Sequence, residues 1–201
     1  GRRPVSATLG DLPADARLLH DAMRRCAATG VDYIKVGVFS RQHLDACLQA
    51  GSRLNSGTAL VAVLFADCDP PLHPLPRFGT AGFTGVMLDT ADKLGGGLLS
   101  NLDLHQLRGF IEQARAQGLL CGLAGSLGLQ DIPPLRALAP DYLGFRGALC
   151  PFSPVLLCSF SPFPLVPSAE MSLSAATLPS DAGLGGRYWR HEDAARHFRG
   201  R

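Results

Sequence analysis

Lysine is almost absent from this sequence of 201 residues. The chain holds nineteen basic residues, of which only Lys35 and Lys93 are lysines, and the other seventeen are arginines. Lys35 interrupts the apolar stretch 32–38, so it is not one more solvated surface cation. A desolvated lysine can lose its proton and act as a base or a Schiff-base amine, which arginine cannot do. Lys35 is therefore a candidate catalytic group; the alternative is a strand lysine held in an ordinary salt bridge.

Three further absences exclude classes of partner. The formal net charge is only +2 and the arginines are scattered, which argues against nucleic acid as a partner. No apolar run approaches the roughly 18–20 residues of a membrane span, so we expect no membrane partner. The six cysteines form no C-x-x-C pair and no metal-ligand spacing. We expect no metal, no other cofactor and a cytoplasmic location, and a homo-oligomer is compatible with the composition.

Apolar runs of strand length alternate six times with segments that have helical or turn character. The expected strands are 5–8, 32–38, 59–65, 85–89, 119–124 and 141–146. Most of them are apolar on both faces, which is typical of a parallel sheet covered by helices. The pattern predicts an α/β fold, either a barrel or an open doubly wound sheet. Asp11 and Pro13 are expected to begin the first helix, Ser40 the second, and Asn101 or Asp103 the longest.

Polar and glycine residues fall at the carboxyl ends of several expected strands. They are Asp11, Asp67, Asp89, Gly125, Ser126, Arg146 and Gly147. In both barrels and open parallel sheets, ligands bind at this edge. The sequence therefore predicts a site there, and Asp11 and Asp67 are its less specific candidates.

The candidate chemistry centres on two amines and a carboxylate. Side chains alternate along a strand, so Lys35 shares a face with Tyr33 and Gly37 and would point into a barrel. Asp89 could position an amine or accept a proton, and Lys93 could hold a phosphate or a developing oxyanion. The alternative for Asp89 and Lys93 is a local ion pair that stiffens their loop.

Two consecutive strand ends have the composition of a phosphate site. Gly125 and Ser126 offer backbone amides and a hydroxyl, and Arg146 and Gly147 add a guanidinium and a further amide. The six histidines fall away from the expected strand ends, so we assign none of them a catalytic role.

The composition changes after residue 150. Residues 151–186 contain six prolines and only two charged residues, with no helical or strand period. We therefore divide the chain into a partial barrel at 1–150 and a Pro/Ser-rich tail at 151–201, which we expect to be poorly ordered.

Five motifs together resemble one enzyme family. They are residues 5–11 (VSATLGD), 32–37 (DYIKVG), 87–91 (MLDTA) followed by Lys93, 122–126 (GLAGS) and 144–148 (GFRGA). From residue 4 to about residue 150, the chain is similar to (5-formylfuran-3-yl)methyl phosphate synthase, also called 4-HFC-P synthase. The resemblance implies a TIM-type (β/α)8 barrel and a carbon–oxygen lyase. Such a lyase condenses two glyceraldehyde 3-phosphate molecules, with loss of phosphate and water, in the biosynthesis of methanofuran or a related C1 carrier.

The resemblance also implies roles for individual residues. Lys35 corresponds to a proton acceptor, Asp89 and Lys93 to other active-site positions, and the loops at Gly125 and Arg146 to phosphate-binding loops. The family's Schiff-base lysine belongs to a strand before Val5, and neither lysine of this chain corresponds to it. We therefore expect about six of the eight β/α units, in a chain that is poorly stable and inactive by itself.

Two alternatives stay open on the sequence. One is a different phosphate-binding, Schiff-base aldolase-type barrel, which would share Lys35 and the phosphate loops. The other is a remnant that binds phosphorylated ligands without catalysis.

Overall fold

A computed structural model describes residues 4–68, 75–92 and 95–145 of the chain. Lys93, Arg146, Gly147 and the expected tail 151–201 lie outside these residues. Within them, six strands form one parallel sheet whose order follows the chain, β1-β2-β3-β4-β5-β6. The strands are β1 (Ser6–Thr8), β2 (Tyr33–Val38), β3 (Ala59–Phe65), β4 (Phe83–Asp89), β5 (Leu120–Leu123) and β6 (Tyr142–Leu143).

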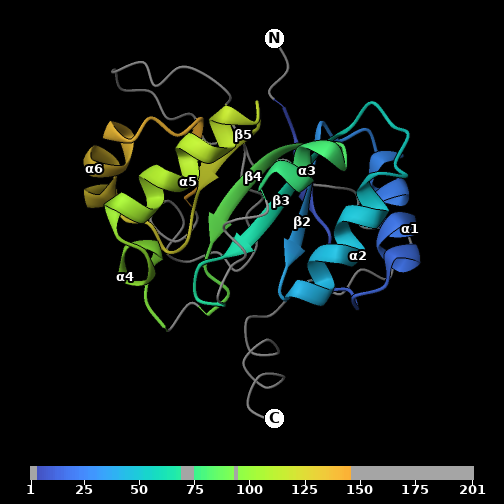
Figure 1. Cartoon of the computed structure of the whole chain (residues 1–201), viewed down its shortest axis with the longest axis horizontal. Coiled ribbons are helices and arrows are strands. Elements are labelled where there is room, and N and C mark those ends of the chain that lie inside the picture. The colour runs from blue at the N-terminus through green and yellow to red at the C-terminus, as the bar shows by residue number, and fades with distance from the viewer. Residues whose placement is uncertain (1–3, 69–74, 93–94, 146–201) are drawn as a thin grey trace.

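Helices connect successive strands. They are α1 (Ala16–Ala27), α2 (Arg41–Gly51), α3 (Leu75–Thr80), α4 (Leu98–Asn101), α5 (Leu104–Ala116), the 3-10 helix η1 (Leu129–Asp131) and α6 (Ile132–Ala137). In Figure 1, α1 and α2 lie beside β2, whereas α5 and α6 lie beside β5 at the other side of the sheet. None of the described helices is long and apolar enough to cross a membrane.

Local side chains begin the longer helices. Ser40 accepts the His43 amide at the start of α2, and Asp103 forms a capping box with Gln106 at the start of α5, as the sequence predicts. The expectation that Asp11 caps α1 is wrong. Asp15 does so instead, because its extended backbone lets the carboxylate reach the Arg17 and Leu18 amides of the first turn.

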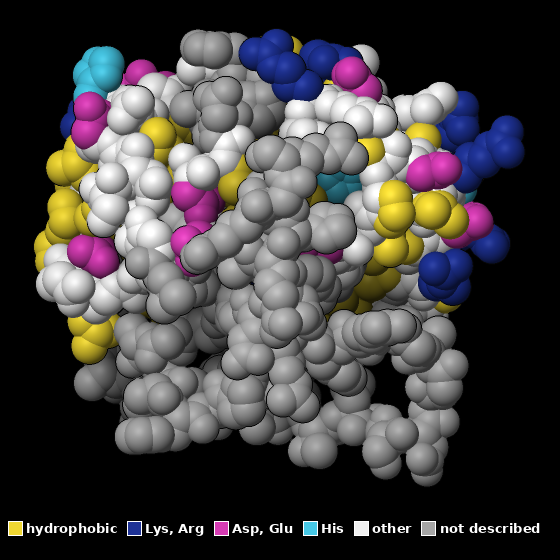
Figure 2. Space-filling model, turned by 90° about the horizontal axis from the view of Figure 1, so that it is seen from below, with side chains coloured by type: hydrophobic (Ala, Val, Ile, Leu, Met, Phe, Trp, Pro, Cys, Tyr) yellow, Lys and Arg dark blue, Asp and Glu magenta, His cyan; other side chains and the backbone are white. Residues whose placement is uncertain are grey.

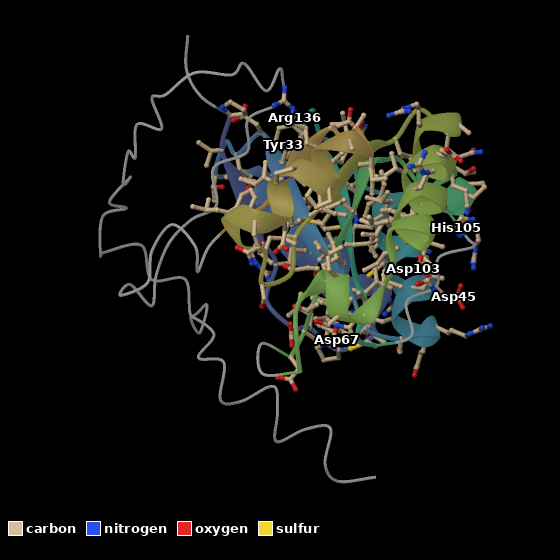
Figure 3. All side chains as sticks on the ribbon, turned by 90° about the vertical axis from the view of Figure 1, so that its left-hand side faces the viewer. Tyr33, Asp45, Asp67, Asp103, His105 and Arg136 are labelled. Atoms are coloured by element: carbon tan, nitrogen blue, oxygen red, sulfur yellow. The ribbon has the colours of Figure 1, made fainter. Side chains whose placement is uncertain are left out.

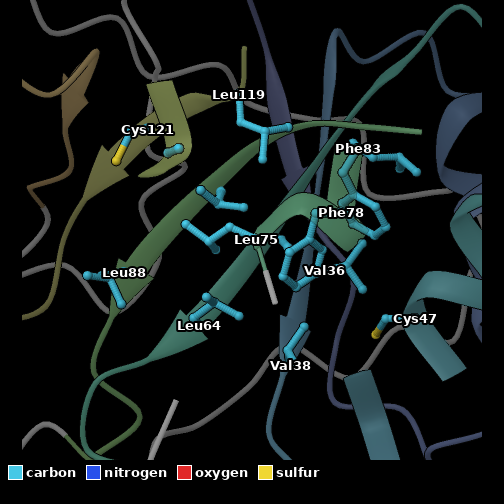
Figure 4. Close-up of a cluster of buried hydrophobic side chains, with 14 of the residues drawn as sticks. Val36, Val38, Cys47, Leu64, Leu75, Phe78, Phe83, Leu88, Leu119 and Cys121 are labelled. Carbon is cyan, nitrogen blue, oxygen red and sulfur yellow. The ribbon is translucent and has the colours of Figure 1, made fainter. Parts of the chain in front are cut away.

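One face of the sheet packs against the helices and forms the main core. On β2 the buried residues are Ile34, Val36 and Val38, which alternate with the half-buried Lys35 face. Phe78 of α3 is fully buried in the same cluster (Figure 4). Because apolar side chains fill this layer, it fixes the direction in which the opposite face of each strand points.

The opposite face carries a much smaller apolar cluster, to which no described helix contributes. Its buried members are Val61, Val63, Met87 and Ala124, with Tyr33, Phe65 and Tyr142 packed against them. Lys35 belongs to this face, as the alternation along β2 predicts. We call it the lysine face.

The structure departs from the expected elements at two loops. The glycine-rich loop after β4 leads into α4, and a turn of 3-10 helix precedes α6; neither was expected. The 3-10 turn is closed locally, by the Gly128 N–H donating to Oδ2 of Asp131, but α4 depends on a distant residue: its first amide, from Leu98, donates to the carbonyl of Gly125, 2.9 Å away. Such pairing across 27 positions leaves no periodic signal in the sequence.

Candidate active site

The strands of a parallel sheet all end at one edge, which we call the carboxyl rim. It comprises residues 9–11, 39–40, 66–68, 90–92 and 124–126, directly after β1 to β5. Figure 3 places Asp67 at this rim and Tyr33 at the opposite end of the sheet. Figure 2 views the molecule from the side of the carboxyl rim; basic side chains lie toward the margin of this face, and acidic side chains lie both at the margin and nearer the middle.

Lys35 lies on the lysine face of β2, the second of the six strands. Its neighbours in register are Thr8 on β1 and Val61 on β3, and it is half-buried. Val61 is 1% exposed, so the stem of Lys35 lies beside a fully apolar neighbour while one side of the residue stays open. The amine is thus on a strand that is paired on both sides, rather than on a loop.

Two stacked aromatic rings lie next to Lys35 at the carboxyl rim. The ring centroids of Phe39 and Phe65 are 4.7 Å apart and the rings are nearly parallel. They cover Gly37, the next residue after Lys35 on the same face: a Cβ there would lie 2.8 Å from Cζ of Phe39 and 3.3 Å from Cε2 of Phe65. Glycine is therefore required for the rings to close over the strand. The sequence did not single out this pair, because the rings come from strands 26 residues apart.

His43 extends this stack on the helix side. Its ring lies 5.3 Å from that of Phe39, and its Nδ1 accepts the Phe39 N–H at 3.3 Å, so the neutral ring carries its proton on Nε2. Burial lowers the pKa of His43 below its usual range. Nε2 is buried and has no hydrogen-bond partner among the described residues. His43 lies within α2 and is only 4% exposed.

Asp67, directly after β3, holds the loop that follows β4. Its Oδ1 accepts the Ala91 N–H at 2.9 Å, and its Oδ2 accepts the Asp92 N–H at 2.7 Å. The Cys68 thiol lies 3.8 Å from the same Oδ1. Burial, followed by the charge of Asp67, raises the pKa of Cys68 to about 11. Both carboxylate oxygens of Asp67 are therefore already engaged by the protein.

Asp89 ends β4 and is held at two points. Its carbonyl accepts the Ala66 N–H at 2.8 Å, and its Oδ1 accepts the N–H of Thr90 at 2.7 Å. Because Lys35 is in register with Val61 and Val61 with Gly85, Asp89 shares the lysine face. Asp89 lies two strands away from Lys35. The β4 residue in register with Lys35 is Gly85, and Asp89 is four residues closer to the carboxyl rim than Gly85.

The loop after β5 has an unusual backbone. Gly125 and Ser126 both have positive φ, +110° and +50°, so their amides turn away from the strand direction. A Cβ on Gly125 would lie 3.0 Å from both Cγ2 and the amide nitrogen of Thr90. Thr90 is 1% exposed, which means that the loops after β4 and β5 are in direct contact. Ser126 is exposed at the rim.

Asp11 lies after β1 and is exposed. Desolvation of its carboxyl group by neighbouring atoms raises its pKa. Among the remaining expected site residues, Lys93, Arg146 and Gly147 lie outside the described residues. Within the described residues, the structure brings Asp67, Asp89 and the Gly125–Ser126 loop together through the loop at 90–92. Lys35 lies on the same face as Asp89, and Asp11 lies in the segment after β1. No group of three or more His, Cys, Asp or Glu side chains in the described part of the chain is arranged to hold a metal ion.

A cavity of about 410 Å³ lies at the other edge of the sheet, which we call the amino rim. It is lined by the last turn of α1 and the segment before β3, including His20, Arg24, Arg53, Ser56 and Thr58. It shares no residue with the carboxyl rim, where the candidate groups gather. The strand-end arrangement, rather than this cavity, is therefore the candidate active site.

Comparison with known proteins identifies the family. The model of a family described as 4-HFC-P synthase matches residues 1–153. A Methylorubrum extorquens protein, provisionally named a (5-formylfuran-3-yl)methyl phosphate synthase, is 45% identical over 150 residues, which are 75% of this chain and 61% of the relative. The synthase of that name from Methanothermobacter thermautotrophicus is 34% identical, over 73% of this chain and 66% of the relative. The one from Methanopyrus kandleri is 36% identical, over 74% and 68%.

The chain thus spans about three-fifths to two-thirds of the length of these relatives. A solved HpcH/HpaI aldolase from Desulfitobacterium hafniense aligns over 70% of this chain and 85% of the aldolase chain. Its sequence identity of 10% and TM-score of 0.31 are too low to support a conclusion about this chain. The family model covers most of the chain, including every motif at the carboxyl rim. The chain belongs to the 4-HFC-P synthase family.

Proposed function

We propose that this chain provides the strand-end machinery of a (5-formylfuran-3-yl)methyl phosphate synthase. The enzyme would condense two glyceraldehyde 3-phosphate molecules and release phosphate and water. The observation that carries the proposal is the half-buried Lys35, on the one face of the sheet that the described helices leave uncovered, in a chain that belongs to this family. Lysine occurs so rarely in this sequence that a second amine on that face is not available from the described residues.

Lys35 would act as the proton acceptor. Joining two aldehydes through carbon requires removal of a proton from a carbon next to a carbonyl or imine, and a neutral amine can take it. The placement of Lys35 on a strand that is paired on both sides supports this role, because a base must be held in a fixed orientation toward the substrate. The imine itself would form on a different lysine, in a part of the enzyme that this chain's match does not cover.

Asp89 and Lys93 would serve the same substrate from the end of β4. Asp89 would orient an amine or accept a proton, and Lys93 would balance a phosphate or an oxyanion. The exposed Ser126 and the turned amides of its loop suit a phosphate group, and Arg146 and Gly147 would complete that site.

The sheet would form six of the eight units of a (β/α)8 barrel, with the lysine face inside. This is supported by the order of its strands, by their parallel direction and by the restriction of helices to the opposite face. Asp89 and the Gly125 loop would then lie at the mouth where barrel enzymes bind their ligands.

The test uses an exchange protein: the Methylorubrum extorquens relative carrying residues 1–153 of this chain in place of its own matching region. We expect it to convert glyceraldehyde 3-phosphate into the furan phosphate, detected by its ultraviolet absorbance and by mass spectrometry. Borohydride added during turnover should trap one covalent adduct on a lysine other than Lys35. The intact relative and an exchange protein with Lys35→Met are the controls.

Two results would contradict the proposal. If the exchange protein folds and yields no furan phosphate while the intact relative does, this chain lacks the machinery. If borohydride traps adducts with pentose or other triose phosphates and not with glyceraldehyde 3-phosphate, the chain is a different Schiff-base aldolase.

A further inference from the structure

We propose that Asp67 is a positioning residue that holds the loops after β4 and β5 in their working arrangement. It would act through Asp89 and the Gly125–Ser126 loop without touching the substrate. The inference rests on the proposed function only for the roles of those two groups. The linkage itself stands on the contacts of the described residues.

The first link joins Asp67 to the loop after β4. Its two oxygens accept two successive main-chain amides, those of Ala91 and Asp92, at 2.9 and 2.7 Å. Hydrogen bonds to an ionised carboxylate are stronger than neutral ones, and two of them fix both the position and the tilt of the loop. The same segment, 66–67, also donates the Ala66 N–H to the carbonyl of Asp89. The segment directly after β3 therefore bonds both the carbonyl of Asp89 and the loop that follows it.

The second link joins this loop to the one after β5. Thr90, directly before the two bonded amides, is buried against the Cα of Gly125. The carbonyl of Gly125 in turn accepts the Leu98 N–H at 2.9 Å, and Asn101 donates its side-chain amide to the carbonyl of Gly97 at 2.9 Å. Movement of residues 90–92 would therefore displace both the candidate carboxylate and the candidate phosphate loop.

The hydrogen bonds that the Asp67 carboxylate already makes argue against a direct catalytic role. Each of its two oxygens already accepts one main-chain amide, those of Ala91 and Asp92. It is also only half-buried at the rim, so an ordinary structural carboxylate is the competing interpretation. The distinction lies in whether its loss disturbs catalysis beyond its effect on folding.

The experiment compares Asp67→Ala and Asp67→Asn with a matched carboxylate at the amino rim. Asp141 is also half-buried and accepts a main-chain amide, that of Cys121, at 2.6 Å. In the exchange protein we expect Asp67→Ala and Asp141→Ala to lower Tm similarly. Only Asp67→Ala should lower kcat, by about 10- to 100-fold, as expected when a supporting group is lost. Asp67→Asn keeps one acceptor oxygen, so its kcat should lie between that of Asp67→Ala and that of the unsubstituted protein.

The pH profile and amide hydrogen exchange complete the test. A positioning role leaves both limbs of the kcat profile in place in Asp67→Asn; disappearance of a limb would make Asp67 an acid or base and overturn the proposal. Unchanged kcat in both Asp67 variants would also overturn it. In the 201-residue chain, Asp67→Asn should accelerate exchange at Leu98 as well as at residues 91–92, whereas Asp141→Ala should not.

These readouts separate the two proposals. If the unsubstituted exchange protein makes no furan phosphate, the proposed function fails, and hydrogen exchange still decides the linkage. Faster exchange at residues 91–92 with no change at Leu98 would show that the two loops are independent and would overturn the inference. Asp67→Asn serves for all measurements should Asp67→Ala not fold.

Discussion

At both rims of the sheet an aspartate carboxylate accepts main-chain amides, but the segments that these bonds hold differ. At the amino rim, Asp32 and Asp141 each stand directly before a strand and accept an amide from the neighbouring strand segment, Val5 and Cys121, at 2.7 and 2.6 Å. At the carboxyl rim, Asp67 accepts amides from a loop. The bonds of Asp32 and Asp141 join neighbouring strand segments. The two bonds of Asp67 instead fix a loop that makes no strand pairing.

The difference indicates what each rim can tolerate. At the amino rim the main chain already pairs beside the carboxylate: the amides of Asp32 and Asp141 donate to the carbonyls of Val5 and Cys121, each at 2.9 Å. Loss of the carboxylate there removes one bond from a continuing ladder. At the carboxyl rim no ladder remains to preserve the loop, so we expect changes there to affect activity more than stability.

Replacing Lys35 should have the largest effect. In the exchange protein we expect Lys35→Arg to keep the charge and the fold but to lower kcat by about 10²- to 10⁴-fold, the usual contribution of a general base. Lys35→Met, which keeps the length without the charge, should lose as much. Steady-state kinetics on variants with matched circular dichroism give the comparison. Near-normal turnover by Lys35→Arg would mean that the position needs only a cation.

Gly125→Ala should come next, because it strains the backbone at φ +110° and drives a methyl group against Thr90. We expect a loss of about 1–3 kcal/mol in the free energy of unfolding, measured with urea, together with lower kcat. Gly109→Ala is the matched control: it lies within α5, where a Cβ meets no atom within 4 Å, and should stabilise the protein by about 0.5–1 kcal/mol. Equal effects of the two substitutions would contradict the contact between the loops.

The amino-rim carboxylates should affect stability without affecting kcat. Asp141→Ala should cost about 1–3 kcal/mol, since it leaves the part-buried strand amide of Cys121 without its acceptor; Asp32→Ala should cost about 0.5–1.5 kcal/mol, since water can replace its bond to the exposed Val5 amide. They lie at opposite sides of the sheet, so the double variant should lose the sum of the two values. A change in kcat per folded molecule in either variant would remove the distinction between the rims.

The smallest effect concerns His43 and pH. Burial lowers its pKa, so the folded protein favours the neutral ring and the unfolded chain binds the proton more readily. Its contribution to stability is complete above the unfolded pKa of about 6.5 and is lost as the pH falls below that value, by at most about 1.4 kcal/mol per pH unit. His43→Gln, which keeps an acceptor for the Phe39 amide, should flatten this part of the stability profile between pH 7 and 5. Parallel profiles for the two proteins would contradict the prediction.

The sequence predicted those features that depend on neighbouring residues. The strand at Tyr33–Val38 and the face of Lys35 follow from alternation along one segment, and the caps at Ser40 and Asp103 lie within one turn of the amides they serve. The first cap was misplaced by four residues, at Asp11 instead of Asp15, because both positions offer a carboxylate before a helical run.

The linkage at the carboxyl rim could not be predicted in the same way. Asp67 was expected near the site, but its partners lie 24 and 25 positions later, and nothing in the local pattern pairs them. The ring stack of Phe39 and Phe65 likewise depends on the register of two strands. The roles of Lys35, Asp89 and the Gly125 loop remain predictions that the kinetic variants test.

Cys68 gives the carboxyl rim a built-in chemical reporter. Its thiol is half-buried, and its pKa of about 11 reflects both that burial and the nearby Asp67 charge. At neutral pH it should therefore alkylate slowly, and neutralising Asp67 should speed the reaction by increasing the thiolate fraction. Peptide mass spectrometry distinguishes it from Cys47, whose buried thiol has a pKa of about 12 and should react only on unfolding. In one alkylation time course, the rate at Cys68 thus reports loosening of the carboxyl rim, and the rate at Cys47 reports unfolding of the sheet and its helices.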